Sequence, residues 1–156
     1  MSAIEEKMKE MGIVLPEAVE PVANYVTVIR AHDMVYTSGS SCFVKGKPAF
    51  VGKVGKDLTV EQGYEAARIT ALNLISVLKS EIGNLDLVER IVKVVGFVNS
   101  APGFVQQTSV IDGASDTFVK IFGDKGKHTR CALGTSVLPF EIPVEIEMTV
   151  LLKESK

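Results

Sequence analysis

The strand predicted at residues 88–98 constrains the fold of this sequence more than any other segment. Its apolar side chains fall on both alternating sets, which in a β-strand point to opposite faces of a sheet. The two sets are Val92, Val94 and Val98 on one side and Ile91, Val95 and Phe97 on the other. Such a strand must be covered on both faces. Because one layer of helices covers a single face, we expect a closed homo-oligomer in which further copies of the chain cover the other.

Helices are predicted before and after this strand. Thr59 and Gln62 form a capping box, apolar residues then recur at helical spacing, and Gly83 ends the run. A second helix is expected within residues 104–122. Further strands are predicted at residues 25–29, 34–38, 131–137 and 144–152, with a small hairpin at residues 43–50.

The resulting order, β-β-(β)-α-β-α-β-β, indicates an α+β fold with both helices on one face of a mixed sheet. The chain has 156 residues, the size of one ordinary domain. Residues 1–21 are expected to form a short N-terminal helix and an extended lead-in, because Ser2 and Glu5 make a capping box and Gly12 follows. Residues 22–152 are expected to form the core.

Composition excludes several classes of function. The formal charge of −2 argues against a nucleic-acid partner, and no apolar run approaches the roughly 18 residues of a membrane span. Two cysteines and no apolar signal segment predict a cytoplasmic protein. No metal-binding spacing of Cys or His is present, so we expect neither a metal nor a cofactor.

Residues 130–147 contain the side chains best suited to chemistry. In the last strand, Val144 and Ile146 face a core, whereas Glu145 and Glu147 point to the opposite face, where a second subunit is expected. Arg130 is expected near the place where that face opens to a cleft. Its planar fork can bind a carboxylate, and Glu145 can orient a water molecule. The alternative is a structural Arg130–Glu145 ion pair across a subunit interface, and spacing alone leaves both open.

The histidines and cysteines are weaker candidates. His32 and His128 are expected to be solvated loop residues, which argues against a histidine-paired nucleophile. Cys131 follows Arg130, so it is either a reactive thiol beside a cation or a small buried strand residue.

The pattern R-x8-P-x5-E-I-E at Arg130, Pro139 and Glu145 resembles the closing signature of the reactive-intermediate deaminase family, also known as endoribonuclease L-PSP. Residues 25–39, which end in Tyr-Thr-Ser-Gly, resemble the first strand pair of that family, and residues 94–104 resemble its central strand. The resemblance covers roughly residues 22–152.

This resemblance implies a chorismate-mutase-like fold assembled as a homotrimer with clefts between subunits. It implies a hydrolase that converts reactive enamines and imines, such as 2-aminoacrylate, to 2-keto acids and ammonia without a cofactor. Arg130 would bind the substrate carboxylate and Glu145 would position the hydrolytic water. Other substrate contacts would come from Tyr25 on the partner side, from the turn with Ser38 and Gly39, and from the Cys131 backbone.

Two positions depart from the family pattern. Ala132 stands where many members have a cysteine, two residues after the arginine, and Asp112 stands near the position of a frequent asparagine. A carboxylate at the cleft disfavours an anionic substrate. The sequence therefore leaves two alternatives to a deaminase, a non-catalytic protein that binds small carboxylates and an endoribonuclease.

Overall fold

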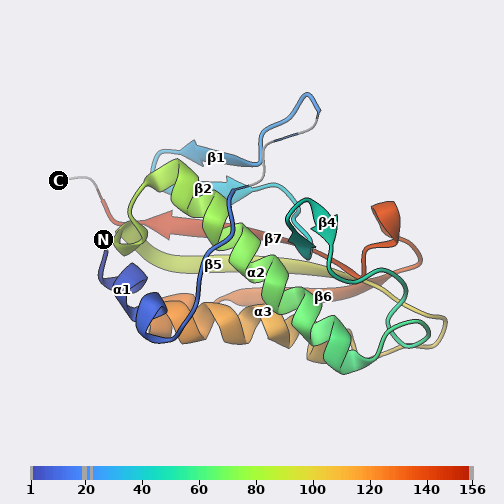
Figure 1. The fold of residues 1–156 in the computed structure, drawn as a ribbon. Coiled ribbons are helices and arrows are strands. Elements are labelled where there is room, and N and C mark those ends of the chain that lie inside the picture. Colours follow the sequence, from blue (N-terminus) through green and yellow to red (C-terminus); the bar gives the residue numbers. More distant parts are fainter. Residues whose placement is uncertain (1, 19–20, 22, 155–156) are drawn as a thin grey trace.

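The structure is a computed structural model that describes residues 2–18, 21 and 23–154. Figure 1 shows helices α1, α2 and α3 on one side of a long sheet. The helices are α1 (Ala3–Glu10), α2 (Val60–Ile82) and α3 (Gln107–Phe122). The strands are β1 (Val28–Ala31), β2 (Met34–Thr37), β3 (Phe43–Val44), β4 (Lys47–Pro48), β5 (Val88–Asn99), β6 (Thr129–Thr135) and β7 (Val144–Leu152). Short 3-10 turns lie at η1 (Leu85–Leu87), η2 (Gly123–Gly126) and η3 (Pro139–Glu141).

Five of the strands form one mixed sheet in the order β1-β2-β7-β5-β6. Strands β5 and β6 pair in parallel around the crossover helix α3, and every other neighbouring pair in this sheet is antiparallel. The short strands β3 and β4 form a separate hairpin. The α+β architecture with a mixed sheet is therefore confirmed.

Helices α2 and α3 lie side by side across one face of the sheet (Figure 1). The Thr59–Gln62 capping box begins α2, and Gly83 ends it, as the sequence predicts. Helix α2 packs on β7, whose inward residues Val144, Ile146, Met148 and Val150 are all buried. Helix α3 packs on β5 and β6. Both predicted helices and the predicted alternation of the last strand are confirmed.

The opposite face of the sheet is open in the single chain. Ile29, Tyr36 and Leu133 are exposed there, and strand pairing places Val95 and Phe97 among them, partly buried. Coverage of this face by further copies stays a prediction. Among the described residues, no helix is long and apolar enough to cross a membrane.

Irregular pairing in β5 explains why its apolar residues fall on both alternating sets. Its register against β7 shifts between Ile91 and Lys93, so that Ile91 and Val94 both lie buried on the helix side. A bulge of this kind changes the face to which later side chains point. The two alternating apolar sets thus do not map directly onto two faces, and Val95 and Phe97 remain as the outward pair.

Strand β6 begins at Thr129, two residues before the predicted start. Arg130 is therefore inside the strand, where it pairs with Val94 of β5. Because paired residues of neighbouring strands point to the same face, and Val94 is buried under the helices, the Arg130 side chain lies on the helix side.

The close approach of α2 and α3 depends on Gly113. A Cβ atom built at this residue would lie 2.0 Å from the carbonyl oxygen of Tyr64 in α2. The backbone of α2 must move to admit it, because a carbonyl oxygen cannot turn aside as a flexible side chain does. The glycine thereby sets the position of α3, which carries Asp112 and Ser115.

We predict that Gly113→Ala destabilises the protein by about 3 kcal/mol, because overpacking against the α2 backbone outweighs the roughly 1 kcal/mol gain in helix propensity. Urea unfolding at one protein concentration measures the change. Ser109→Ala, an exposed substitution on the same helix, is the control and should leave the midpoint nearly unchanged. A Gly113→Ala midpoint at or above that of the wild type would contradict this account of the packing.

Candidate functional site

The structure distributes the predicted site residues over three places. Tyr25, Ser38, Gly39 and Glu145 line one cavity. Arg130 and Asp112 line a second, smaller cavity beside α3. Cys131 lies apart from both, on the open face of the sheet, where it pairs with Val95.

The larger cavity, called here the β7-edge cavity, has a volume of about 590 Å³. It lies where β2 has ended at Thr37 while β7 continues. Beyond that point an isolated bridge joins Ser40 to Ile146, and the Ser41 hydroxyl donates to the carbonyl oxygen of Val144. Apolar side chains form much of its wall. They are Phe43, Leu74, Val77, Pro139, Phe140 and Ile142.

Gly39 contacts the Glu145 side chain in this cavity. A Cβ atom built at Gly39 would lie 2.9 Å from Cδ of Glu145 and 3.0 Å from its Oε1. The neighbouring Ser38 donates its hydroxyl hydrogen bond to the carbonyl oxygen of Val26 at 2.6 Å. Ser38 thus holds the segment next to Tyr25 in place, and the absence of a side chain at Gly39 leaves room for the carboxylate.

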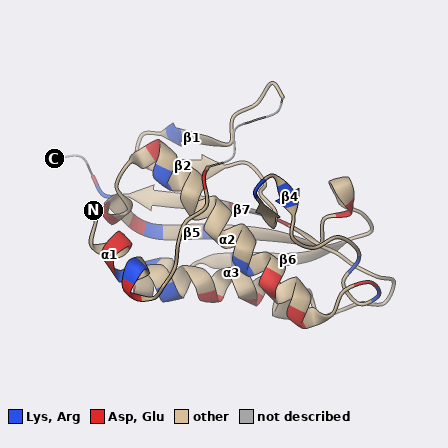
Figure 2. Cartoon of the chain, in the orientation of Figure 1, with Lys and Arg blue, Asp and Glu red and all other residues tan. Residues whose placement is uncertain are grey.

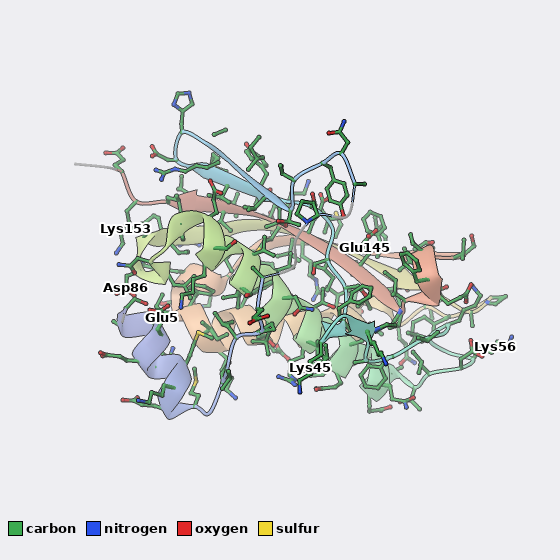
Figure 3. All side chains as sticks on the ribbon, turned by 45° about the horizontal axis from the view of Figure 1, so that its top comes forward. Glu5, Lys45, Lys56, Asp86, Glu145 and Lys153 are labelled. Carbon is green, nitrogen blue, oxygen red and sulfur yellow. The ribbon has the colours of Figure 1, made fainter. Side chains whose placement is uncertain are left out.

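Glu145 is a perturbed acid, and Figure 3 shows it well away from Glu5 of α1. Partial burial raises the pKa of its carboxyl above the ordinary value, and the nearby Glu147 carboxylate raises it further. A carboxyl with a raised pKa can exchange protons closer to neutral pH than an exposed one. Such groups are typical of catalytic sites.

The smaller cavity, called here the α3 cavity, has a volume of about 300 Å³ and contains the guanidinium of Arg130. Nη1 of Arg130 donates to Oδ1 of Asp112 at 2.7 Å and to Oγ of Ser115 at 3.1 Å. The Arg130 side chain is 22% exposed and that of Asp112 is 50% exposed. Asp112, the departure from the family pattern, is therefore the ionic partner of Arg130.

The sequence places Arg130 near the face that carries Glu145, whereas within one chain it lies on the helix side. A meeting of the two groups in a cleft between subunits stays a prediction. Glu145 pairs with Phe97 on the outward side of the sheet, whereas Arg130 pairs with Val94 on the helix side. Strand β5 also separates β6 from β7.

Two expectations are wrong. Cys131 is exposed in the single chain, so it is not a small buried strand residue. His128 is half-buried in the α3 cavity and hydrogen-bonded, so it is not a solvated loop residue. The sequence around His128 does not indicate that it is buried, because its burial comes from packing of η2 and the start of β6 against α3.

The structure also shows how charged side chains and possible metal ligands are distributed. Figure 2 shows Lys, Arg, Asp and Glu interspersed along the helices and loops, with neither sign confined to one part of the ribbon. Within the described ranges, no group of three His, Cys, Asp or Glu side chains is placed to hold a metal ion.

Comparison with known proteins adds the family. Residues 5–149 match the family model described as "YjgF/chorismate mutase-like, putative endoribonuclease". The chain belongs to the YjgF family. Protein TCP17 of Trypanosoma cruzi is 39% identical over 146 residues, which are 93% of this chain and 91% of TCP17. The sequence resemblance to the L-PSP group is thereby confirmed, and it extends across both cavities.

Solved structures share the fold of this chain. A protein of unknown function from Agrobacterium tumefaciens is 38% identical, with a TM-score of 0.89 over 96% of this chain and 92% of that one. A structure titled as a putative endoribonuclease from Shewanella oneidensis is 30% identical, with a TM-score of 0.92 over 96% and 99%. At 19% identity, E. coli TdcF, solved with bound serine, shares the fold, with a TM-score of 0.65 over 88% and 94%.

We predict that Glu145 titrates above the ordinary glutamate pKa and that Glu147→Gln moves its pKa part of the way down. Burial, the larger cause of the shift, remains in that variant. Carbon-13 NMR of the side-chain carboxyls against pH measures both values, and Glu61→Gln on the exposed start of α2 is the control.

The same shift has a consequence for stability. A folded-state pKa above the unfolded value means that the folded chain holds the proton more tightly, so Glu145 lowers stability as pH rises between the two values. Glu145→Gln should therefore unfold at higher urea than the wild type above this interval. An unshifted Glu145 titration with no gain in the variant would contradict the prediction.

Proposed function

We propose that this YjgF-family protein is a hydrolase that deaminates small imines and enamines of 2-amino acids to 2-keto acids and ammonia. Its site would lie in a cleft that two subunits of a homotrimer complete. One subunit would supply Arg130, and its neighbour would supply Tyr25, Gly39 and Glu145.

The observation that carries the proposal is the state of Arg130. Its Nη1 is occupied by Asp112 and Ser115, whereas Nε and Nη2 have no hydrogen-bond partner among the described residues. These two nitrogens form one edge of the guanidinium fork and can bind both oxygens of a carboxylate. Asp112 and Ser115 hold the fork in one orientation, which lowers the entropy lost when a substrate binds.

Glu145 supplies the second requirement of the reaction. An imine carbon is already electrophilic, so the protein need only orient it and a water molecule. Water adds its oxygen to this carbon while one of its protons passes, by way of the carboxylate, to the imine nitrogen. The hydroxyl proton of the resulting carbinolamine then passes to the same nitrogen as the C–N bond breaks, which leaves the keto acid and ammonia. A carboxyl with a raised pKa can take up the first proton and return it to the departing nitrogen.

Separation of the two groups in one chain supports a site shared between chains. The open face lies between Glu145 and the β6 edge, and its exposed apolar residues favour coverage by another copy. The structural relative with bound serine is an amino-acid-binding member of this fold, which favours a substrate of that class.

We predict that Arg130→Ala lowers kcat/KM for iminopyruvate hydrolysis by at least about 100-fold, because two charge-assisted hydrogen bonds of roughly 1.5–3 kcal/mol each are lost. Glu145→Gln should lower kcat with a smaller effect on KM. When the two variants are refolded together, about a quarter of the shared clefts would contain both native residues, so activity should return to about a quarter of that of the wild type.

This mixture separates the proposal from its rivals. If a single chain supplied both groups, mixing would restore nothing, and the shared cleft would be ruled out. Refolding each variant alone is the control for recovery of material. Wild-type protein that accelerates no imine derived from an amino acid would rule out deamination.

Asp112, which departs from the deaminase pattern, pairs with Arg130, and this departure favours a second candidate, a cleft that binds carboxylates without turnover. In either candidate the Asp112 charge weakens carboxylate binding. Asp112→Asn keeps an oxygen acceptor and removes the negative charge. If Arg130 binds the substrate carboxylate, KM should fall by up to roughly 5-fold, since an exposed charge interaction contributes up to about 1 kcal/mol. Keto-acid binding that tightens without any turnover would support the second candidate, and unchanged KM and binding would contradict both.

A further inference from the structure

The α3 cavity contains a hydrogen-bonded chain, from Ser115 through His128 to Gly126, of which the deamination proposal uses only the contact of Ser115 with Arg130. Oγ of Ser115 lies 2.9 Å from Nε2 of His128, and Nδ1 of His128 lies 2.6 Å from the carbonyl oxygen of Gly126. Both side chains line the cavity together with Arg130. A hydroxyl, an imidazole and an orienting acceptor in sequence are the arrangement by which a serine becomes a nucleophile.

The protons in this chain can be assigned from the partners. The Gly126 carbonyl can only accept, so Nδ1 of His128 carries a hydrogen and donates it. In the neutral ring Nε2 is then an acceptor, and the Ser115 hydroxyl donates to it. Nη1 of Arg130 donates to Oγ from another direction, at 3.1 Å. The serine proton is thus already directed at the base.

His128 is held in the neutral form that a general base requires. Desolvation lowers its pKa below the ordinary value of 6.5, the bond to Gly126 opposes this, and the Arg130 charge lowers it again. The ring of Phe118 packs against the imidazole edge-to-face, with centroids 5.8 Å apart. The other charged groups lining the cavity are Lys127 and Asp112, and Asp112 is paired with Arg130.

We propose that Ser115 and His128 form a nucleophile–base pair that accepts an acyl group from small activated esters. Oγ of Ser115 would attack the ester carbonyl carbon as its proton passes to Nε2 of His128, and the C=O electrons would move to the oxygen. Arg130 lies beside the pair, with Nη1 3.1 Å from Oγ, and its positive charge would stabilise that oxyanion. When the oxyanion collapses, the C–O bond to the leaving group breaks, and the alcohol departs with the proton from His128. Water, deprotonated by the same ring, then releases the acid and restores Ser115.

This activity is independent of Glu145 and of a shared cleft, since all its groups come from one chain. Placement of Ser115 within α3 gives the nucleophile a rigid support, which favours a fixed attack geometry. Imine hydrolysis and acyl transfer can therefore succeed or fail separately.

The test is covalent labelling with a small alkyl fluorophosphonate. Attack by Oγ forms a P–O bond and breaks the P–F bond, so that the label stays on Ser115 while fluoride leaves and His128 takes the proton. Intact mass followed by peptide mapping should find one label per chain, on Ser115. The rate should rise with the neutral fraction of His128, with a midpoint below 6.5, the ordinary histidine pKa.

Variants make the result specific. His128→Gln should slow labelling by roughly 100-fold, the usual contribution of a general base. Ser115→Ala should abolish it, and Ser109→Ala, exposed on the same helix, should react as the wild type does. In the wild type, p-nitrophenyl acetate should give a burst of nitrophenol.

Three outcomes would overturn the proposal. They are no labelling of the folded wild type, labelling at residues other than Ser115, and labelling of Ser115 that His128→Gln leaves unchanged. The first, combined with a lower unfolding midpoint in Ser115→Ala, would assign the chain of hydrogen bonds to bracing Arg130 alone.

Discussion

The helices cover only one face of the sheet, so strand register decides whether each candidate side chain lies beneath the helices or on the open face. Strand β6 pairs with β5 so that Arg130 is in register with Val94, beneath α3. Strand β7 pairs so that Glu145 is in register with Phe97, on the face without helices. A carboxylate and a guanidinium that the sequence places in one motif are thereby held on opposite sides of the sheet. Any chemistry that needs both must recruit a second chain, which the apolar open face favours.

Asp112 gives the guanidinium a fixed position at the cost of part of its charge. The pair is partly exposed, with Asp112 half in solvent, so the attraction is screened and modest in energy. Its effect on geometry is larger, because Asp112 and Ser115 are neighbours on α3 and both contact Nη1. The other edge, Nε and Nη2, has no hydrogen-bond partner among the described residues. In the proposed function, the departure from the family pattern would therefore change the strength of carboxylate binding without removing the guanidinium.

Much of the fold followed from local rules, and the site did not. Capping at Ser2 and Thr59 could be predicted because a cap and its partner lie three residues apart in the sequence. The alternation along β7 could be predicted because it is also a local pattern. The bulge in β5 and the early start of β6 depend on pairing between distant segments, and a shift by one residue reverses the face. The burial of His128 could not be predicted either, because it depends on the packing of η2 against α3, which places His128 beside Ser115.

Arg130 takes part in both proposed chemistries. Nη1 contacts Ser115 and Asp112, and the opposite edge remains for a carboxylate. A substrate carboxylate bound at Nε and Nη2 would neutralise the charge that is proposed to stabilise an ester oxyanion. The two substrates should then exclude each other at one guanidinium, although the attacking groups differ. Because Ser115 and His128 come from the same chain as Arg130, and Glu145 is proposed to come from the neighbour, the acyl chemistry would survive dissociation of the assembly and the deamination would not.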